Sequence, residues 1–174
     1  MQQLLIAEPE FDSLADLYDA MLNRGLAVSG EDKDYFAEKR VSWLYKRLNS
    51  LGAESRRVLD FGCGTGTAVP YLFDALRAET VTGVDVSTAS LEVARKTHAG
   101  RPASFLVPAE LPANEFDVAY TNGVFHHIEP AQRGGAVAAV FDALRPGGYF
   151  ALRENKAWNP GTRDVMSRIP FDRD

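Results

Sequence analysis

The residues of this chain with the clearest chemical potential lie in a short run rich in glycine. Residues 58–66 read Val-Leu-Asp-Phe-Gly-Cys-Gly-Thr-Gly. Gly62, Gly64 and Gly66 let the backbone turn sharply, and they let a ligand approach the main chain with no Cβ in the way. A helix expected to start near Thr67 would point its N-terminal amides toward the same place. The run is therefore typical of a ligand-binding loop that follows a buried strand.

Two carboxylates flank this loop and narrow the class of ligand. Asp60 lies two positions before Gly62. It suits a ligand with an ammonium group better than a pyrophosphate, which its charge would repel. Asp85 ends the next β-rich run. A carboxylate there can accept hydrogen bonds from both hydroxyls of a ribose, whether the ligand carries an ammonium group or a pyrophosphate. The alternative is a dinucleotide site, whose G-x-G-x-x-G fingerprint needs glycine at position 67, where this chain has threonine. Asp60 and the glycine spacing disfavour that alternative.

The elements that must hold these residues alternate between β-rich runs and segments of helical period. Strands are expected at residues 57–61, 81–86, 104–107, 116–120 and 149–152. Helices are expected at residues 34–51, 67–76 and 87–94, and on the face marked by Val137, Val140, Phe141 and Leu144. Pro146-Gly147-Gly148 should end the last helix. Strands separated by helices imply a mostly parallel sheet with helices on both faces, which is the α/β fold class.

Composition disfavours several kinds of partner. The net charge is −5, and no cluster of lysine and arginine lies along the chain. Proteins that bind duplexes are usually basic on one face, so we expect no nucleic-acid partner. Nothing approaches the roughly 18 consecutive apolar residues of a membrane span, and no basic leader opens the chain. The single cysteine, Cys63, has no basic neighbour to make it a nucleophile. We expect no membrane partner and a cytoplasmic location.

Five motifs in order resemble those of class I S-adenosylmethionine-dependent methyltransferases. They are the glycine loop, Gly83-Val84-Asp85-Val86-Ser87, Phe116-Asp117-Val118, His126-His127-Ile128 and Leu144-Arg145-Pro146-Gly147-Gly148. The match spans about residues 36–155. The resemblance implies a Rossmann-like core over residues 33–155 that binds S-adenosyl-L-methionine and leaves S-adenosyl-L-homocysteine. It implies no metal, and it implies in-line methyl transfer to an acceptor that we expect to be a small molecule.

The resemblance also implies roles for single residues around the methionine part of the cofactor. The loop Gly62–Gly66, with Cys63 in it, would lie under the methionine. Asp60 would hold the amino group, and Thr121 would offer its carbonyl to the same group.

Around the nucleoside, Asp85 would bind the ribose and Val86 would pack on the adenine. Ala109 and Glu110 would edge the adenine. The family often has an aspartate just before this pair, where this chain has Pro108. Either Glu110 takes over the contact with the adenine amine or the backbone alone makes it.

His126 and His127 follow the fourth expected strand, close to where the resemblance would direct the methyl group. Histidine is the side chain most easily tuned to accept a proton near neutral pH. Adjacent residues of a turn point in different directions, so we expect at most one of them to face an acceptor as general base. The alternative is a histidine that packs and hydrogen-bonds its own loop, and it is favoured for His127. Residues 153–155, after the fifth strand, either reach the substrate or are solvated charges.

The two ends of the chain add expectations about organisation. Residues 1–32 are interpreted as an N-terminal helical cap, and residues 156–174 are too few for the last two strands that the family usually adds. Either the chain is a truncated form, or the apolar edge at Phe150 and Leu152 is covered by another subunit, as a homodimer through the exposed edge of the sheet. The short C-terminus also motivates a second hypothesis, a catalytically silent cofactor-binding partner subunit. An NAD(P)-dependent reductase is the third and least favoured.

Overall fold

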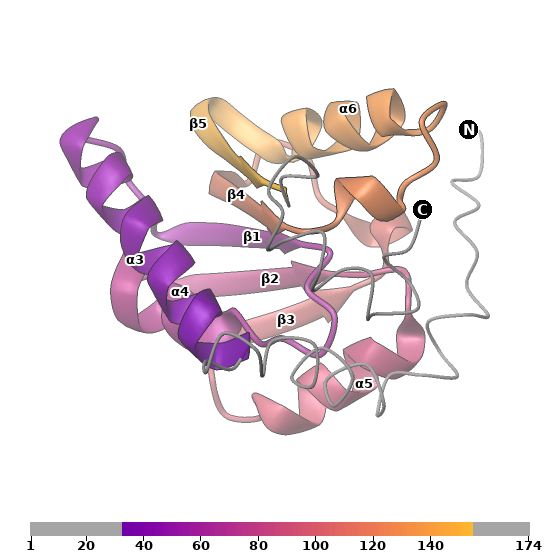
Figure 1. Cartoon of the computed structure of the whole chain (residues 1–174), viewed down its shortest axis with the longest axis horizontal. Coiled ribbons are helices and arrows are strands. Elements are labelled where there is room, and N and C mark those ends of the chain that lie inside the picture. The colour runs from indigo at the N-terminus through magenta and orange to yellow at the C-terminus, as the bar shows by residue number, and fades with distance from the viewer. Residues whose placement is uncertain (1–32, 155–174) are drawn as a thin grey trace, which may run out of the picture.

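The fold is a single parallel sheet with helices on both faces. A computed structural model describes residues 33–154, so the expected N-terminal cap and the residues after 154 lie outside the described range. The described strands are β1 (Arg57–Phe61), β2 (Thr80–Val84), β3 (Ala103–Leu106), β4 (Phe116–Asn122) and β5 (Leu144–Arg153). Their order across the sheet is β3-β2-β1-β4-β5, and all neighbouring pairs are parallel (Figure 1). The Rossmann-like α/β class is confirmed.

Four helices and two short 3-10 turns connect these strands within the described range. They are α3 (Lys33–Ser50), α4 (Val69–Leu76), α5 (Thr88–Thr97), η2 (Pro108–Glu110), η3 (Phe125–His127) and α6 (Arg133–Ala143). Each of the expected helices is present. Ser87 caps α5 as expected, because its hydroxyl accepts a hydrogen bond from the Ser90 amide at 3.1 Å. None of the described helices is long and apolar enough to cross a membrane.

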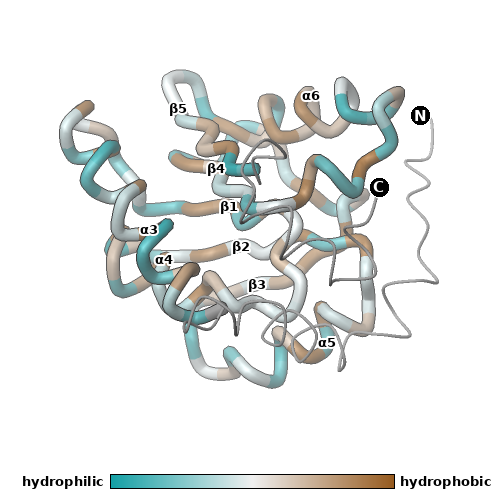
Figure 2. The backbone as a smooth tube through the Cα atoms, in the orientation of Figure 1, coloured by the Kyte–Doolittle hydropathy of each residue, from teal (hydrophilic) through white to brown (hydrophobic). Residues whose placement is uncertain are grey.

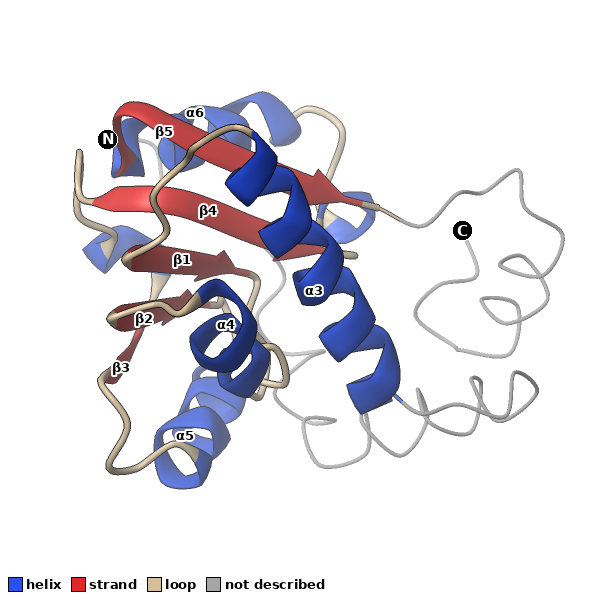
Figure 3. Ribbon diagram, turned by 90° about the vertical axis from the view of Figure 1, so that its left-hand side faces the viewer, coloured by secondary structure: helices blue, strands red, loops and turns tan. Residues whose placement is uncertain are grey.

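Alternate residues of the central strands build two cores. Val58 of β1 packs in one core with the apolar faces of α3, α4 and α5. Its neighbour Leu59 packs in the other core with α6. Figure 3 shows α3 and α4 in front of the sheet, α5 below β3, and α6 behind β5. Figure 2 shows hydrophobic segments inside the fold along β1 and β2, which both cores bury.

The expected apolar face of α6 is only half correct. Val140 is fully buried, but Val137 is 42% exposed and Phe141 is 74% exposed. The stripe that faces the sheet is Ala136, Val140 and Ala143, because small side chains let the helix approach closely. Leu144 is buried, but it begins β5 rather than ending the helix. Phe141 therefore contributes an exposed aromatic side chain instead of core.

Strand β5 begins five residues earlier than expected and contains the Pro-Gly-Gly segment. Leu144 pairs with Phe116, the register then shifts, and Tyr149 pairs with Val118. Gly147 has a φ of 82°, which glycine adopts without strain. The segment is an irregularity inside a strand rather than a loop before one. At the far end of β5, Leu152 is 52% exposed on an edge of the described sheet. The homodimer through this edge stays a prediction.

The amino-terminal edge of the sheet is tied together by one buried carboxylate. Asp117 accepts hydrogen bonds from the Arg56 and Arg57 amides at 2.8 and 2.9 Å. Its other oxygen lies 2.9 Å from Nε of Arg145, whose Nη2 is 2.9 Å from Glu54. Asp117 is only 2% exposed, and a buried charge is tolerated when it is paired and hydrogen-bonded in this way. We call these five residues the Asp117 clamp: Asp117, Arg56 and Arg57 through their amides, Arg145 and Glu54.

Candidate functional site

The candidate site lies at the carboxyl edge of the sheet, between β1 and β4. Strands are added to opposite sides of β1, so the loops after β1 and β4 diverge there, and open α/β sheets bind ligands at such a point. The residues predicted from the sequence follow or end β1, β2, β3 and β4. Because neighbouring strands are parallel, their carboxyl ends meet at the same end of the sheet. The fold therefore brings all of the predicted residues to one side of the molecule.

The glycine loop has a backbone conformation with positive φ angles, which glycine adopts more easily than other residues. Gly62, Gly64 and Gly66 have φ values of 76°, 52° and 82°. A Cβ on Gly62 would overlap the side chain of Val124, and one on Gly66 would lie 2.7 Å from Nε2 of His98. Both the backbone conformation and the close approach therefore require glycine at these two positions.

Asp85 and the end of β2 hold this loop in place. The carbonyl of Val84 accepts hydrogen bonds from the Gly62 and Cys63 amides at 2.7 and 3.0 Å. One carboxylate oxygen of Asp85 accepts from the Gly64 amide at 2.7 Å, and the other accepts from the Ser87 amide at 2.9 Å. A carboxylate has about four acceptor positions. Asp85 can thus stabilise the loop and still contribute to a ligand.

Asp60 is a buried acid whose second oxygen lacks a partner. Its side chain is 3% exposed, and Oδ2 makes no hydrogen bond within the described part of the chain. Burial, and then the negative charge of Asp85, raises the pKa of Asp60 to about 7. A buried unsatisfied acceptor costs free energy that a donor from a ligand would recover. Asp60 is therefore prepared for a cationic donor.

Two polar groups of this region, on Tyr120 and Arg40, were not predicted from the sequence. Tyr120 stands next to Asp60 in the register of β1 and β4, and its hydroxyl is buried without a hydrogen bond to any described group. Nε of Arg40, on α3, is buried without one as well. The Tyr120 hydroxyl interacts electrostatically with both Asp60 and Arg40, and burial raises its pKa. Burial lowers the pKa of Arg40, and the positive charge of Arg153 lowers it further against the influence of Tyr120.

A sequence signal for Arg40 does exist. The buried face of α3 includes Leu44 and Leu48, and Arg40 precedes them at the same helical spacing of four residues. A charged residue on the apolar stripe of a helix marks a position where the stripe meets a polar site.

Cys63 is a packing residue of the loop. It is buried, and its Sγ would lie 2.8 Å from a Cβ placed on Gly83 of β2. Burial, followed by the charges of Asp60 and Asp85, raises the pKa of its thiol well above the usual value. A thiol that stays protonated is a poor nucleophile. The interpretation of Cys63 as a small residue in a tight turn agrees with this environment.

The residues predicted to contact the nucleoside lie around the ends of β2 and β3. Val86 is partly buried after β2, while Ala109 and Glu110 are exposed on η2 after β3. Glu110 accepts from the Val107 amide at 3.3 Å, so the carboxylate is turned toward its own backbone. Thr121 is fully buried in β4, one residue beyond Tyr120. Their proposed roles toward adenine and the amino group stay predictions.

The two histidines lie on η3, directly after β4. Nδ1 of His126 is 2.8 Å from Oε2 of Glu154, the residue after β5. Oε1 of Glu154 accepts from the Val124 and Phe125 amides at 3.0 and 2.9 Å. The rings of His126 and His127 are 3.9 Å apart. Glu154 therefore reaches back across the sheet edge to the histidine turn, which the sequence did not indicate.

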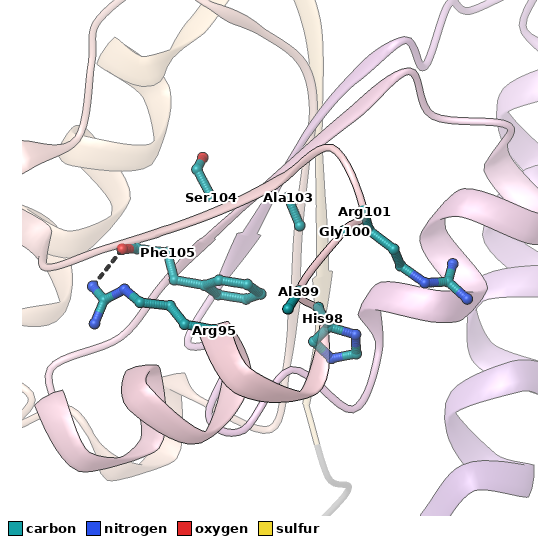
Figure 4. A pocket seen from close by; sticks show the side chains of 8 residues that line it. All are labelled: Arg95, His98, Ala99, Gly100, Arg101, Ala103, Ser104 and Phe105. Atoms are coloured by element: carbon teal, nitrogen blue, oxygen red, sulfur yellow. Dashed lines mark hydrogen bonds between the residues drawn. The ribbon is translucent and has the colours of Figure 1, made fainter.

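A separate pocket of about 240 Å³ lies between α5 and β3 (Figure 4). Arg95 donates to the Phe105 carbonyl at 2.6 Å, and the Phe105 ring stacks on His98 at 5.9 Å. Nε2 of His98 is 2.9 Å from the Gly66 carbonyl. The pocket includes none of the residues predicted to bind a ligand, and His98 connects it to the glycine loop as structural support. Within residues 33–154, no group of three or more potential metal ligands occurs.

Comparison with known proteins agrees with this arrangement. A family model described as a methyltransferase domain matches residues 59–150. An uncharacterised methyltransferase of Synechocystis sp. is 36% identical over 102 residues, which is 56% of this chain and 46% of that protein. The carboxy-S-adenosyl-L-methionine synthase of Campylobacter curvus is 32% identical over 154 residues, or 83% of this chain and 61% of that protein. This chain thus spans about half of the length of these relatives.

A solved structure supports the fold. The TehB-like SAM-dependent methyltransferase of Corynebacterium glutamicum aligns with a TM-score of 0.61 at 22% identity, over 90% of this chain and 83% of that one. The family model covers more than half of the chain and includes the glycine loop, Asp85 and the histidine turn. The chain therefore belongs to the class I S-adenosylmethionine-dependent methyltransferase family.

Proposed function

We propose that this chain binds S-adenosyl-L-methionine at the carboxyl edge of its sheet and transfers the methyl group to a small-molecule acceptor. The observation that carries the proposal is a pair of buried groups that have no hydrogen-bond partner among residues 33–154, an acceptor on Asp60 and a donor on Arg40. When bound, the cofactor supplies a methyl group on a positively charged sulfur.

The unpartnered groups fit the amino-acid end of that cofactor. An α-ammonium group would satisfy Oδ2 of Asp60 and favour its ionised form, because an opposite charge offsets desolvation. An α-carboxylate would accept from Nε of Arg40 and from the hydroxyl of Tyr120, which interacts electrostatically with both Asp60 and Arg40. A ligand with both an ammonium group and a carboxylate thus fits a site that offers an acceptor on Asp60 and donors on Arg40 and Tyr120. The charges of the site and of this ligand are complementary.

The other contacts that we propose with the cofactor follow from where the residues lie at the ends of the strands. The backbone of Gly62–Gly66 admits the methionine chain, and Asp85 accepts from the ribose hydroxyls at the end of β2. Val86, Ala109 and Glu110 surround the adenine. The protein then has to align the acceptor and exclude water, since the methyl group arrives already activated.

Calorimetric titration with S-adenosyl-L-homocysteine tests the cofactor site without knowledge of the acceptor. We expect binding, and at 100 times the dissociation constant the ligand should add about 2.7 kcal/mol to the free energy of unfolding. NAD serves as the comparison ligand. Stabilisation by NAD with none by S-adenosyl-L-homocysteine would reject the proposal and favour a reductase.

A second candidate is a protein that binds the cofactor but does not transfer its methyl group. The observation that favours it is that a relative 32% identical over 154 residues is named a carboxy-S-adenosyl-L-methionine synthase and not a methyltransferase. Incubation with methyl-labelled cofactor and a panel of metabolites separates the two. Binding without label transfer to any metabolite supports the second candidate.

A further inference from the structure

We propose that His98 is a positioning residue of this site, and that it holds the Gly66 carbonyl so that the glycine loop keeps the backbone conformation to which the methionine part of the cofactor binds. The inference rests on the proposed function and adds to it the residue that fixes the loop from the side of α5. The sequence alone does not indicate this role, because His98 and Gly66 are 32 positions apart.

His98 is the C-terminal cap of α5, and its side chain reaches the end of the glycine loop. The residue is only 7% exposed, and its Nε2 lies 2.9 Å from the carbonyl oxygen of Gly66. A carbonyl oxygen can only accept, so Nε2 carries the proton and donates it to this bond. The same carbonyl accepts from the amide of Val69, the first residue of α4, at 3.1 Å. The Gly66 carbonyl is therefore held by the start of α4 and by the end of α5.

The imidazole of His98 also limits where the loop can go. A Cβ on Gly66 would lie 2.7 Å from Nε2 and 2.8 Å from Cδ2 of His98. The ring thus fills the space on the α5 side of Gly66, next to the main chain. The loop cannot relax toward α5 unless the ring moves.

The position of the His98 ring is in turn fixed by β3. It stacks on the ring of Phe105, with the centroids 5.9 Å apart and the planes at 27° (Figure 4). The ring of Phe105 lies against Gly83 of β2, and Sγ of Cys63 lies against the same glycine, because a Cβ there would be 2.7 Å from one and 2.8 Å from the other. The Gly66 amide donates to the Cys63 carbonyl at 2.9 Å. Both ends of this turn are therefore supported by packing from β2, β3 and α5.

The charge state of His98 suits a support beside a cationic ligand. Burial lowers the pKa of His98 against the hydrogen bond with the Gly66 carbonyl, which raises it, and the positive charge of Arg101 lowers it further. The ring is therefore neutral near pH 7. A neutral donor can hold the carbonyl without adding a positive charge next to a cofactor that carries one on sulfur. His98 thus acts on the site through geometry and not through proton transfer.

A positioning role and a purely structural role differ in their effect on affinity. A ligand binds only the molecules whose loop has the binding conformation, so the apparent dissociation constant rises as that fraction falls. A contact that only stabilises the fold changes the free energy of unfolding and leaves the affinity of the folded protein unchanged. The bond from His98 ends on the loop itself, so we expect its loss to change both quantities.

Calorimetric titration of the full chain with S-adenosyl-L-homocysteine is the first test. His98→Phe keeps a ring to stack on Phe105 but cannot donate to Gly66, and the loss of one hydrogen bond should weaken the affinity about fivefold to tenfold. His98→Asn, which is too short to reach the carbonyl, should show a similar loss. His98→Gln keeps a donor of sufficient reach and should restore most of the affinity.

A matched control separates affinity from stability. Ser104→Ala removes the hydrogen bond of 3.0 Å between the hydroxyls of Ser104 and Thr82, which joins β2 and β3 away from the loop. It should lower the midpoint of urea unfolding and leave the affinity for S-adenosyl-L-homocysteine unchanged.

The second test asks which part of the cofactor depends on His98. 5′-Methylthioadenosine has the nucleoside but neither the α-ammonium nor the α-carboxylate group. We expect His98→Phe to bind it as tightly as the wild type does, because the loop contacts the methionine part.

The third test needs no ligand. Amide hydrogen exchange follows Val69, whose amide shares the Gly66 carbonyl with His98. Exchange in the ligand-free protein should be several-fold faster in His98→Phe and His98→Asn than in the wild type and His98→Gln, because the loop opens more often.

The outcomes separate this inference from the proposed function. An affinity for S-adenosyl-L-homocysteine that His98→Phe and His98→Asn leave unchanged, or a loss that His98→Gln does not restore, overturns the positioning role. Equal losses for S-adenosyl-L-homocysteine and 5′-methylthioadenosine overturn its assignment to the methionine part. A wild type that binds neither ligand is the separate failure of the proposed function, and the exchange of Val69 then still decides whether His98 holds the loop.

Discussion

Replacing Asp60 by asparagine should stabilise the ligand-free protein while weakening its affinity for the cofactor. The folded protein holds this carboxyl with a pKa of about 7, against 3.8 for the ordinary side chain. Between these values the folded state binds more protons than the unfolded state, so stability falls as pH rises through this window. Three pKa units at about 1.36 kcal/mol each give about 4 kcal/mol as the cost of ionising Asp60 above pH 7. Asparagine avoids that cost because it carries no charge.

The assay is thermal or urea unfolding of wild type and Asp60→Asn at pH 8 and near pH 4.5. We expect the variant to gain a few kcal/mol at pH 8, which is about 2–4 °C in Tm for each kcal/mol, and much less at the lower pH. Asp142→Asn, an exposed carboxyl on α6, is the matched control and should show no such pH-dependent gain.

Ligand binding supplies the second half of this prediction. S-adenosyl-L-homocysteine keeps its ammonium group, so its affinity for the wild type should fall about tenfold for each pH unit below 7, and this dependence should be absent in Asp60→Asn. The reasoning is refuted if Asp60→Asn destabilises the protein equally at both pH values, or if the variant binds the ligand as tightly as the wild type at pH 8.

Three further substitutions test separate parts of the structure. Gly62→Ala places a Cβ on Val124 at a positive φ, so calorimetry should detect at least a tenfold loss of ligand affinity together with a lower Tm; unchanged affinity would contradict the close approach. Arg40→Met removes the donor for the cofactor carboxylate and should weaken S-adenosyl-L-homocysteine by roughly 1–3 kcal/mol, whereas an analogue without that carboxylate should bind both proteins alike. Asp117→Ala breaks the Asp117 clamp and should cost about 3–5 kcal/mol in urea unfolding, and a loss below 1 kcal/mol would show that the clamp is not important for stability.

The sequence was sufficient for the fold because local signals and global topology agree in it. The run before Gly62 is buried on both faces, as a central parallel strand must be, and Ser87 stands where a helix needs a cap. The glycine loop could be predicted from its sequence, since Gly62 and Gly66 combine a positive φ with a close approach that a Cβ would prevent. The same signals placed Asp60 and Asp85 at one edge of the sheet.

The parts that were missed depend on contacts between distant segments. Arg40 and Tyr120 are 80 positions apart, and only the packing of α3 on the sheet brings them close enough to interact electrostatically. Glu154 reaches His126 because β5 lies beside β4, and neither residue signals the other by spacing. Phe141 reads as core by helical period, but small side chains at Ala136 and Ala143 set the face that packs. Pairing across elements decides such cases, and periodicity carries no information about it.

The Asp117 clamp has a consequence for how this scaffold can change. It joins the beginnings of β1, β4 and β5 at one end of the sheet, whereas the glycine loop, η2 and η3 leave from the other end. Insertions, deletions and substitutions in the loops of the ligand end therefore leave the fastening of the strands intact. Changes in the ligand-binding loops can therefore accumulate without loss of the contacts by which the clamp stabilises the sheet.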